Sequence, residues 1–287
     1  MEDRRTRRTE VFNANLHLFA NGGYRTPSGE WTAFNEGSGR LYSAPVRGGC
    51  PPRYSTRISV VRDDCIEVAR RLVEEGLETA ILNMASARNP GGGVERGSGA
   101  QEEQLCRRSD LLLSLYRFSP EHRRRYPELK IAAGEGRYPL HSRWGGIHSE
   151  SVLFFRESEK DGYALSDEPF RAGVISVAAI AHPALDEKGR MTAEDASLTR
   201  DKIRTILRIG MENDYEAIVL GALGCGAFRN PPRQMARLFR EVLEEPEFTG
   251  QFRRIVFAIL EDRNSARNSA EGNYIPFKEE FDRKKAK

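Results

Sequence analysis

The chain has 287 residues, of which 39% are hydrophobic and 30% charged, a composition typical of a soluble globular protein. The 45 Lys and Arg residues exceed the 42 Asp and Glu residues by a formal charge of only +3, so no direct nucleic-acid contact is predicted. No apolar run approaches the roughly 18 residues that a membrane span needs. The charged N-terminus is not followed by an apolar segment, so neither a membrane protein nor a secretory signal is predicted.

The cysteines and histidines carry no recognisable metal or redox pattern. The four cysteines lie far apart in the sequence without a CxxC pair: Cys50, Cys65, Cys106 and Cys225. Reduced thiols in a cytoplasmic protein are therefore expected, with no metal and no cofactor. HExxH, GxSxG and Walker A motifs are absent from the sequence, which argues against a metalloprotease, a serine hydrolase and a P-loop NTPase.

Strands and helices are predicted to alternate after an irregular first part. Residues 1–52 are rich in Gly and Arg and are expected to form an N-terminal extension that packs on the core, with a helix at 11–19. The core domain then covers residues 53–287. It begins with a short β-branched run at 57–61, a helical pattern that ends at Gly76, and an apolar strand at 79–84.

The second half of the chain repeats this alternation. A helix opening at Gln101 is expected to carry both Leu105 and Leu112, and residues 120–145 are expected to form surface helix and loop. Further strands are predicted at 152–155, 174–180, 217–221 and 255–260, and further helices after a cap at 192–195 and over 235–243. The pattern predicts one α/β domain with a partly parallel sheet between helices. A charged tail at 277–287 is expected to be frayed or to pack only through Phe277 and Phe281.

Two glycine-rich loops follow predicted strands, where open α/β sheets place their ligands. The first covers residues 83–103 and contains the triplet Gly91 to Gly93; the second covers 221–232 and contains Gly224 and Gly226. Glycines allow backbone N–H groups to approach a phosphate, so the two loops together could hold a diphosphate. One such loop could equally be a simple turn, and the lone GxG lacks the third glycine of a dinucleotide-binding motif, which argues against a nicotinamide dehydrogenase.

Two adjacent carboxylates, Glu102 and Glu103, follow the first loop directly. One acidic residue in a first helical turn is ordinary capping, but two beside a possible ligand loop point to chemistry. Neighbouring like charges raise one pKa, and a carboxyl that is protonated near neutral pH can act as a general acid. Successive helical positions point about 100° apart, so we expect one acid and one positioning partner.

Other loop residues allow both a structural and a functional interpretation. Phe228 could stack on a sugar or a base, or it could fold into the core. Asn83 and Asn89 could bind ribose hydroxyls, although Asn is also a common turn residue. Cys225 is interpreted as a small loop residue because the sequence places no activating His beside it. The arginines at positions 4, 5, 7 and 8 are interpreted as a solvated helix face.

The run NPGGG, seven residues and then QEE resembles the signature of poly(ADP-ribose) glycohydrolases, and the surrounding LNMASARNPGGGVERGSGAQEEQLCRRSDLL resembles their bacterial-type branch. The similarity extends through VLFFRE, VISVAAIAHPAL and IVLGALGCGAFRNPP, and covers about residues 56–260. It implies a macrodomain-like fold, a mixed sheet between helices, and hydrolysis of the ribose–ribose O-glycosidic bond from the chain end, without a metal.

The resemblance also implies roles for single residues. Glu103 would be the acid that protonates the leaving ribose oxygen, and Glu102 would hold ribose hydroxyls. Phe228 would pack over the distal ribose. The remaining expected ligand-binding residues come from the strand before the first loop and from the two loops: Asn83, Asn89, Gly91, Gly92, Gly93, Val94, Gln101, Gly224, Cys225, Gly226 and Ala227.

Poly(ADP-ribose) on modified proteins is the expected partner, ADP-ribose the expected product, and a monomer the expected state. Two other functions fit a chain of this type: a macrodomain that binds ADP-ribose without cleaving it, and a hydrolase of mono-ADP-ribosylated protein or nucleic acid. A binding module typically lacks the QEE acid, which is intact here. Product analysis on poly- and mono-ADP-ribosylated substrates separates the two enzymes.

Overall fold

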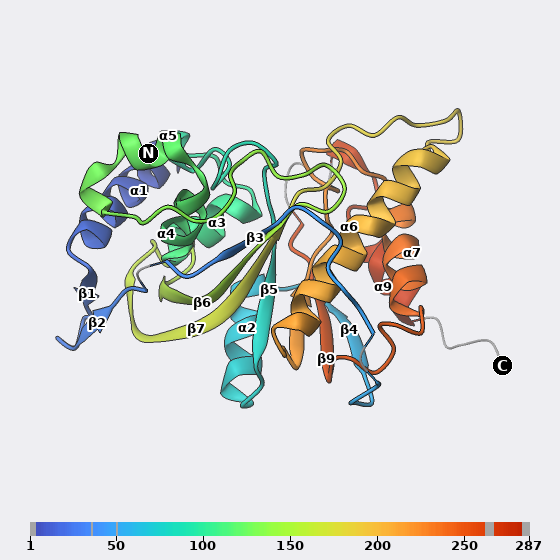
Figure 1. Ribbon diagram of the computed structural model, residues 1–287, viewed down its shortest axis with the longest axis horizontal. Helices are drawn as coiled ribbons and strands as arrows, with labels where there is room; N and C mark the ends of the chain where they lie inside the picture. The colour runs from blue at the N-terminus through green and yellow to red at the C-terminus, as the bar shows by residue number, and fades with distance from the viewer. Residues whose placement is uncertain (1–3, 36, 50, 262–266, 283–287) are drawn as a thin grey trace.

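The computed structural model describes residues 4–35, 37–49, 51–261 and 267–282 (Figure 1). Within them, seven strands form one mixed sheet in the order β3-β6-β7-β5-β8-β9-β4. The strands from β7 to β4 run parallel, whereas β6 is antiparallel to both β3 and β7. The sheet strands are β3 (Arg40–Tyr42), β4 (Arg57–Val61), β5 (Thr79–Met84), β6 (Gly146–Arg156), β7 (Leu165–Val177), β8 (Ala217–Leu220) and β9 (Arg254–Ala258). A separate hairpin pairs β1 (Gly23–Arg25) with β2 (Trp31–Ala33).

Helices cover both faces of this sheet (Figure 1). The first layer contains α1 (Arg4–Ala20), α2 (Cys65–Glu74), α3 (Gln101–Arg108), α4 (Leu111–Leu115) and α5 (Pro120–Arg125), with short 3-10 turns η1 (Val94–Arg96), η2 (Tyr116–Phe118) and η3 (Pro127–Leu129). The second layer contains α6 (Ala193–Glu212), α7 (Pro232–Leu243) and α9 (Tyr274–Asp282).

The central strand β5 shows how the sheet separates two hydrophobic cores. Side chains alternate between the faces of a strand, and Ile81 belongs to the core under α2, whereas Ala80 and Leu82 belong to the core under α6 and α7. All three are buried, as expected for a strand covered by helices on both sides. The α/β prediction with a partly parallel sheet is confirmed.

Several element boundaries agree with the sequence patterns. The predicted strands at 57–61 and 79–84 are β4 and β5, and the predicted cap of α6 is formed by Thr192, whose hydroxyl accepts the Asp195 N–H at 3.1 Å. β6 and β7 are much longer than predicted, and they form a long antiparallel pair with bulges. The segment before residue 52 contributes β3, which is an edge of the main sheet.

One prediction about a helix was wrong: Leu105 and Leu112 do not share one helix, because the chain leaves the helical conformation at Ser109 (φ −145°, ψ 174°) and bridges to Phe154. The arginines at positions 4, 5 and 7 of α1 are exposed, as predicted. Arg8 is partly buried and forms two hydrogen bonds with Glu159, at 3.0 and 2.8 Å. In the tail, α9 continues to Asp282 with Phe277 fully buried, and residues 283–287 and Cys50 lie outside the described residues.

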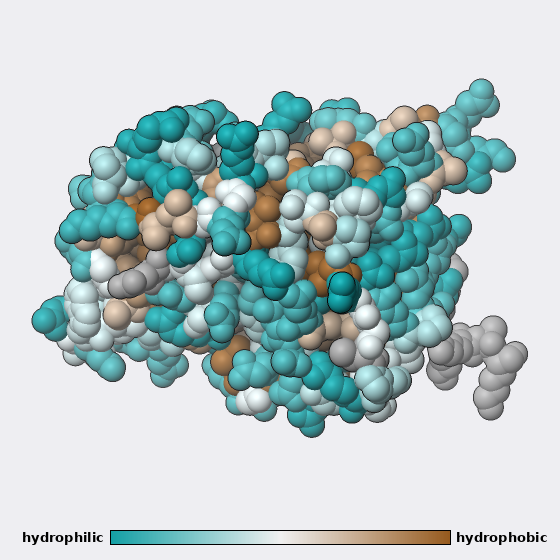
Figure 2. All heavy atoms as spheres, viewed as in Figure 1, coloured by the Kyte–Doolittle hydropathy of each residue, from teal (hydrophilic) through white to brown (hydrophobic). Residues whose placement is uncertain are grey.

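The surface in Figure 2 is hydrophilic over most of the visible face, and hydrophobic side chains appear there in small, separated groups. Among the described residues, no helix is both long and apolar enough to cross a membrane. The same part of the chain contains no group of three or more His, Cys, Asp or Glu residues arranged to hold a metal ion.

Candidate active site

Three loops meet at the carboxyl end of the parallel strands. β5 lies between β7 and β8 and runs parallel to both, so the loops that follow these strands leave the sheet at the same edge. A Cβ at Gly221 would lie 3.3 Å from Met84 Cε, and Asn230 Nδ2 donates to the Ile180 carbonyl at 2.7 Å. The structure therefore brings together the two glycine loops that the sequence separates by more than a hundred residues.

The first loop folds back over the start of α3. Gly91 and Gly92 have φ angles of +76° and +61°, in the left-handed region that glycine adopts without strain. The loop closes through internal bonds, because Gly92 N–H donates to the Asn89 carbonyl at 2.9 Å and Val94 N–H donates to the Gly91 carbonyl at 3.1 Å. This conformation directs the neighbouring amides of Gly91 and Gly93 toward α3.

These amides bind the two carboxylates of α3. Glu102 accepts the N–H of Ser86 at 2.7 Å on one oxygen and the N–H of Gly91 at 3.1 Å on the other. Glu103 Oε1 accepts the N–H of Gly93 at 2.8 Å. Both side chains are buried, with 4% and 7% of their area exposed. The other oxygen of Glu103 is buried and has no hydrogen-bond partner among the described residues.

Gly92 leaves no space for a side chain between the loop and the carboxylates. A Cβ at this position would lie 2.5 Å from Glu103 Oε1 and 2.9 Å from Glu102 Oε2. Real Cβ contacts essentially never fall below 3.0 Å. The close approach of backbone to both carboxylates thus requires glycine here, in addition to the positive φ angle.

Burial raises the pKa of Glu102 to about 8. The hydrogen bond from the Ser86 N–H lowers this pKa, and the neighbouring charge of Glu103 raises it. Burial also raises the pKa of the Tyr138 phenol well above its ordinary value, and the nearby charge of Glu102 acts in the same direction. The Tyr138 hydroxyl oxygen is buried without a partner in the described residues. The pair of carboxylates can therefore carry a proton near neutral pH.

The amides for which phosphate contacts were predicted in the first glycine loop have other partners in this structure. The N–H groups of Gly91 and Gly93 donate to carboxylates, and those of Gly92 and Val94 donate within the loop. Amides engaged in this way are not available to an anion. The triplet thus places the backbone close against the acidic pair.

The other residues predicted in and beside the first loop differ in how much they can offer a ligand. Gln101 uses both ends of its amide on β5: Oε1 accepts the Met84 N–H at 2.9 Å and Nε2 donates to the Leu82 carbonyl at 2.7 Å. The Val94 side chain lies in the core, and Asn89 is exposed. Asn83 is fully buried and donates to Ser176 Oγ at 3.0 Å, while its Oδ1 has no partner in the described residues.

The second loop is held by Asn230 and presents free amides. Asn230 Nδ2 donates to the carbonyls of Ile180 at 2.7 Å and Gly224 at 3.1 Å, and Gly224 has a φ of +74°. Within the described residues no hydrogen bond engages the N–H groups of Gly224 or of residues 226–228. Consecutive unpaired amides of this kind form a concave site for an anion.

Two side chains of the second loop differ in exposure. Cys225 is fully buried, burial raises the pKa of its thiol, and its carbonyl accepts the Asn268 side chain at 2.9 Å. Phe228 is partly exposed and packs against neither hydrophobic core. The thiol is thus a packing group, whereas the Phe228 ring remains accessible at the edge of the site.

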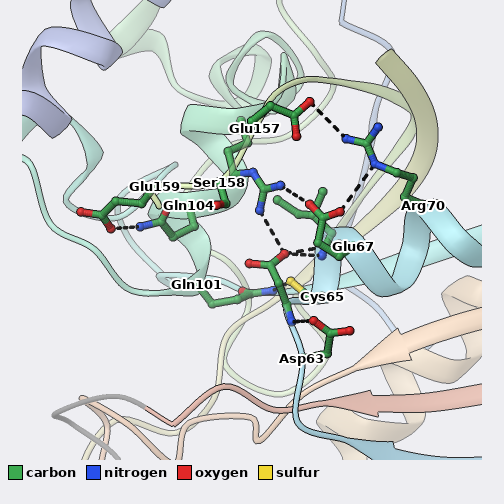
Figure 3. Close-up of polar contacts among 12 residues, drawn as sticks. Asp63, Cys65, Glu67, Arg70, Gln101, Gln104, Glu157, Ser158 and Glu159 are labelled. Carbon is green, nitrogen blue, oxygen red and sulfur yellow. Dashed lines mark hydrogen bonds and ion pairs between the residues drawn. The ribbon is translucent and has the colours of Figure 1, made fainter. Parts of the chain in front are cut away.

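Polar contacts behind α3 fix it to its neighbours (Figure 3). Gln104 donates to Glu159 at 3.1 Å, and Gln101 lies beside Cys65 at the start of α2, with 3.5 Å between Nε2 and Sγ. Arg70 lies between Glu67 and Glu157, with N–O distances of 3.7 Å to each. α3 is therefore anchored on the side opposite the glycine triplet.

The sequence analysis did not identify two further segments beside the acidic pair and the second loop. The loop after β7 contributes Ala179, whose Cβ would lie 2.6 Å from a Cβ at Gly224, and Ile180, which binds Asn230. Leu140 N–H donates to the Ala87 carbonyl at 2.8 Å and brings Tyr138 next to the acidic pair. The sequence analysis assigned neither segment to the site, because the strand order of the sheet determines which loops meet there.

A mixed α/β sheet with a buried carboxylate pair and a second glycine loop at the ends of parallel strands is the arrangement of a macrodomain-like hydrolase. The family model for the catalytic domain of microbial-type poly(ADP-ribose) glycohydrolase (PARG) matches residues 13–157, half of the chain. The chain belongs to this family and is a glycosyl hydrolase that acts on poly(ADP-ribose). The resemblance stated from the sequence is confirmed, as is the macrodomain-like fold.

Solved structures of bacterial glycohydrolases are similar over nearly the whole chain. The enzyme from Thermomonospora curvata is 30% identical, covers 96% of this chain and 100% of its own, and has a TM-score of 0.77. Its complex with the inhibitor ADP-HPD gives 29% identity, coverage of 95% and 98%, and a TM-score of 0.74. The Deinococcus radiodurans enzyme in complex with ADP-ribose is 30% identical, with coverage of 85% and 94% and a TM-score of 0.64. A search of curated proteins found no match to the chain.

Proposed function

We propose that Glu103 is the general acid of poly(ADP-ribose) hydrolysis and that Glu102 positions the ribose beside it. The observation that carries this assignment is the difference between the two carboxylates. Both oxygens of Glu102 accept backbone N–H groups, whereas Glu103 has one fixed oxygen and one buried oxygen without a partner in the described residues. A buried polar atom left unpaired costs free energy unless a ligand or water completes it. Glu103 Oε2 is therefore the atom available to the glycosidic oxygen.

The diphosphate of the substrate is expected to bind the second loop. The unpaired amides at Gly224 and at residues 226–228 supply donors without a competing carboxylate, and Phe228 can cover the adjoining ribose. The Deinococcus radiodurans relative was solved with ADP-ribose, which supports the same ligand here. Gln101 and Val94 then act by shaping the site, because the amide of the first is engaged and the side chain of the second is in the core.

The reaction follows from these positions. Glu103 donates a proton to the oxygen of the leaving ribose as the bond from that oxygen to the anomeric carbon breaks. The distal ribose gains oxocarbenium character, and water adds to its anomeric carbon while returning a proton to Glu103. The products are free ADP-ribose and a chain with one unit fewer, with cleavage at the chain end. The monomeric state and the cytoplasmic location remain predictions from the sequence.

The test is release of free ADP-ribose from poly(ADP-ribosyl)ated protein by wild type and by Glu103→Gln. We expect release by wild type and a loss of at least about 100-fold in the variant, because a positioned general acid contributes roughly 10²–10⁴-fold. ADP-ribose affinity in calorimetry should change less than about tenfold, since the variant loses the proton and keeps the site. Equal loss of turnover and binding would instead assign Glu103 to the structure of the loop.

A further inference from the structure

Arg107 of α3 lies one helical turn after Glu103 and is completely buried. Its guanidinium donates through Nε to the Arg8 carbonyl at 3.1 Å and through Nη2 to the Val94 carbonyl at 3.4 Å. Nη2 also donates to the Ser98 carbonyl. The side chain thus joins three segments: α3, the turn after the glycine triplet, and α1.

Arg107 has no carboxylate within ion-pair distance among the described residues. Burying a cation is costly unless its donors are satisfied. Backbone carbonyls engage Nε and Nη2 of Arg107, whereas Nη1 is buried without a hydrogen-bond partner among the described residues. The next residue, Arg108, is equally buried, with 1% of its side chain exposed, but it pairs with Asp64 at 3.0 Å and Glu67 at 2.5 Å. The two adjacent arginines therefore differ in the element that each one holds.

The carbonyls bound by Arg107 belong to the turn that positions the acid. Ser98 N–H donates to the Gly93 carbonyl at 3.1 Å, which closes the turn on the residue whose own N–H binds Glu103. A continuous path of hydrogen bonds runs from Arg107 through Ser98 and Gly93 to Glu103 Oε1. Displacing the turn from Arg107 would move the Gly93 amide, which holds Glu103 Oε1.

α1 closes the same turn from outside. A Cβ at Gly97 (φ +71°) would lie 2.4 Å from the Arg5 carbonyl, and a Cβ at Gly99 would lie 2.2 Å from Arg8 Nη1. Arg5 Nε also donates to the Arg96 carbonyl at 2.8 Å. Farther along α1, Asn15 Nδ2 donates to the backbone carbonyl of Arg107 at 2.8 Å. The contact leaves space only for glycines, so α1 and the turn fit together tightly.

We propose that Arg107 is a positioning residue for glycosidic cleavage: it holds the turn at 94–98 between α3 and α1 and thereby keeps the Gly93 amide on Glu103. This proposal rests on the assignment of Glu103 as the acid. Arg107 contacts no part of the substrate in this scheme, so its loss should affect the chemical step more than binding.

The test compares Arg107→Lys with the matched variant Arg108→Lys. Lysine keeps the charge but cannot place planar donors on carbonyls of two segments. We expect Arg107→Lys to lower kcat by about 10- to 100-fold, the cost of a misplaced catalytic group, with the ADP-ribose Kd within about threefold. Amide hydrogen exchange of residues 91–98 should become faster in this variant. Arg108→Lys should keep kcat within about twofold and leave that exchange unchanged, even where its stability falls.

A kcat for Arg107→Lys within twofold of wild type, or equal losses in both variants, would overturn the proposal. If Arg107→Lys does not fold, Arg5→Ala removes the exposed contact to the Arg96 carbonyl and should lower kcat by about two- to fivefold; wild-type kcat in that variant also overturns it. Failure of the underlying assignment is recognised separately, because Glu103→Gln would then retain turnover whatever the Arg107 variants do.

Discussion

Gly93 donates its backbone N–H to Glu103 Oε1 at 2.8 Å, so the residue that ends the glycine triplet fixes one oxygen of this carboxyl, and the other oxygen has no hydrogen-bond partner among the described residues. Backbone amides do not change position when a side chain rotates, and they carry no charge of their own. A carboxyl held in this way is oriented by a neutral, preorganised donor.

The first prediction concerns Gly92→Ala. The new Cβ would lie 2.5 Å from Glu103 Oε1 and would require φ near +61°, so the loop and the carboxylates must move apart. We expect kcat to fall by about 100-fold, the size associated with a displacement of about 1 Å. Steady-state kinetics on poly(ADP-ribose) checks this. Gly76→Ala is the matched control, because its φ is +78° with no atom within 4 Å of a Cβ and it ends α2 away from the acids. Similar kcat losses in both variants would contradict the prediction.

The second prediction follows from the pKa of Glu102, which burial raises to about 8 from an ordinary value of 4.5. The folded state then holds a proton that the unfolded state has lost between about pH 4.5 and 8. Stability from this residue therefore falls as pH rises through that range, and it stays constant above it. We therefore expect the unfolding free energy of Glu102→Gln, relative to that of wild type, to be about 1–4 kcal/mol higher at pH 8.5 than at pH 5, since one pKa unit corresponds to about 1.4 kcal/mol.

Urea unfolding of both proteins at the two pH values measures this change. Glutamine presents an NH₂ group to the Ser86 or Gly91 amide, which adds a constant loss at every pH, so the change in the difference with pH is the informative quantity. A difference between the two proteins that does not vary with pH would mean that Glu102 is ionised in the folded protein throughout this range.

The third prediction concerns the partly exposed ring of Phe228. If it covers a ribose of the bound ligand, Phe228→Ala should raise the ADP-ribose Kd by about two- to tenfold, the equivalent of roughly 0.5–1.5 kcal/mol for an aromatic contact. The melting temperature should hardly change, because the ring packs against neither core. Trp31→Ala is the control: this ring is 50% exposed on β2, far from the strand-end loops (Figure 1). An unchanged Kd for Phe228→Ala would place the ring outside the ligand contact.

Hydrophobic periodicity predicted those helices and strands whose position depends only on which side chains are buried. Thr79–Met84 is covered on both faces and Met235 to Leu243 on one, so their hydropathy patterns were sufficient. The break at Ser109 could not be predicted in this way. It depends on Asp110, a buried carboxylate whose oxygens accept the N–H groups of Asn35 and Leu153, far away in the sequence. Long-range hydrogen bonds of this kind leave no local pattern.

The candidate site shows the same limit. The motif identified the acidic pair and both loops, but it could not reveal that the Gly91 and Gly93 amides face Glu102 and Glu103 and are thereby unavailable to phosphate. The direction of these amides depends on the path of the loop, which turns back over α3. The contribution of Ile180 depends on β7 lying beside β5, which is a property of the strand order.

The last prediction concerns Asn230, which is fully buried and holds the second loop through one amide group. Its Nδ2 lies within hydrogen-bonding distance of the carbonyls of Ile180, Gly224 and Phe228, at 2.7, 3.1 and 3.4 Å. Asn230→Ala leaves these carbonyls without that donor, at a cost of about 1–3 kcal/mol in unfolding free energy.

Without this hydrogen-bond donor, the second loop no longer holds the amides of residues 226–228 in one fixed arrangement, so the ADP-ribose Kd should rise by about tenfold. kcat at saturating substrate should fall less, because the acidic pair lies on α3 and not on this loop. Calorimetry and steady-state kinetics on the same preparation distinguish the two effects. A fall in kcat at unchanged Kd would show that the second loop acts on the chemical step and that the diphosphate binds elsewhere.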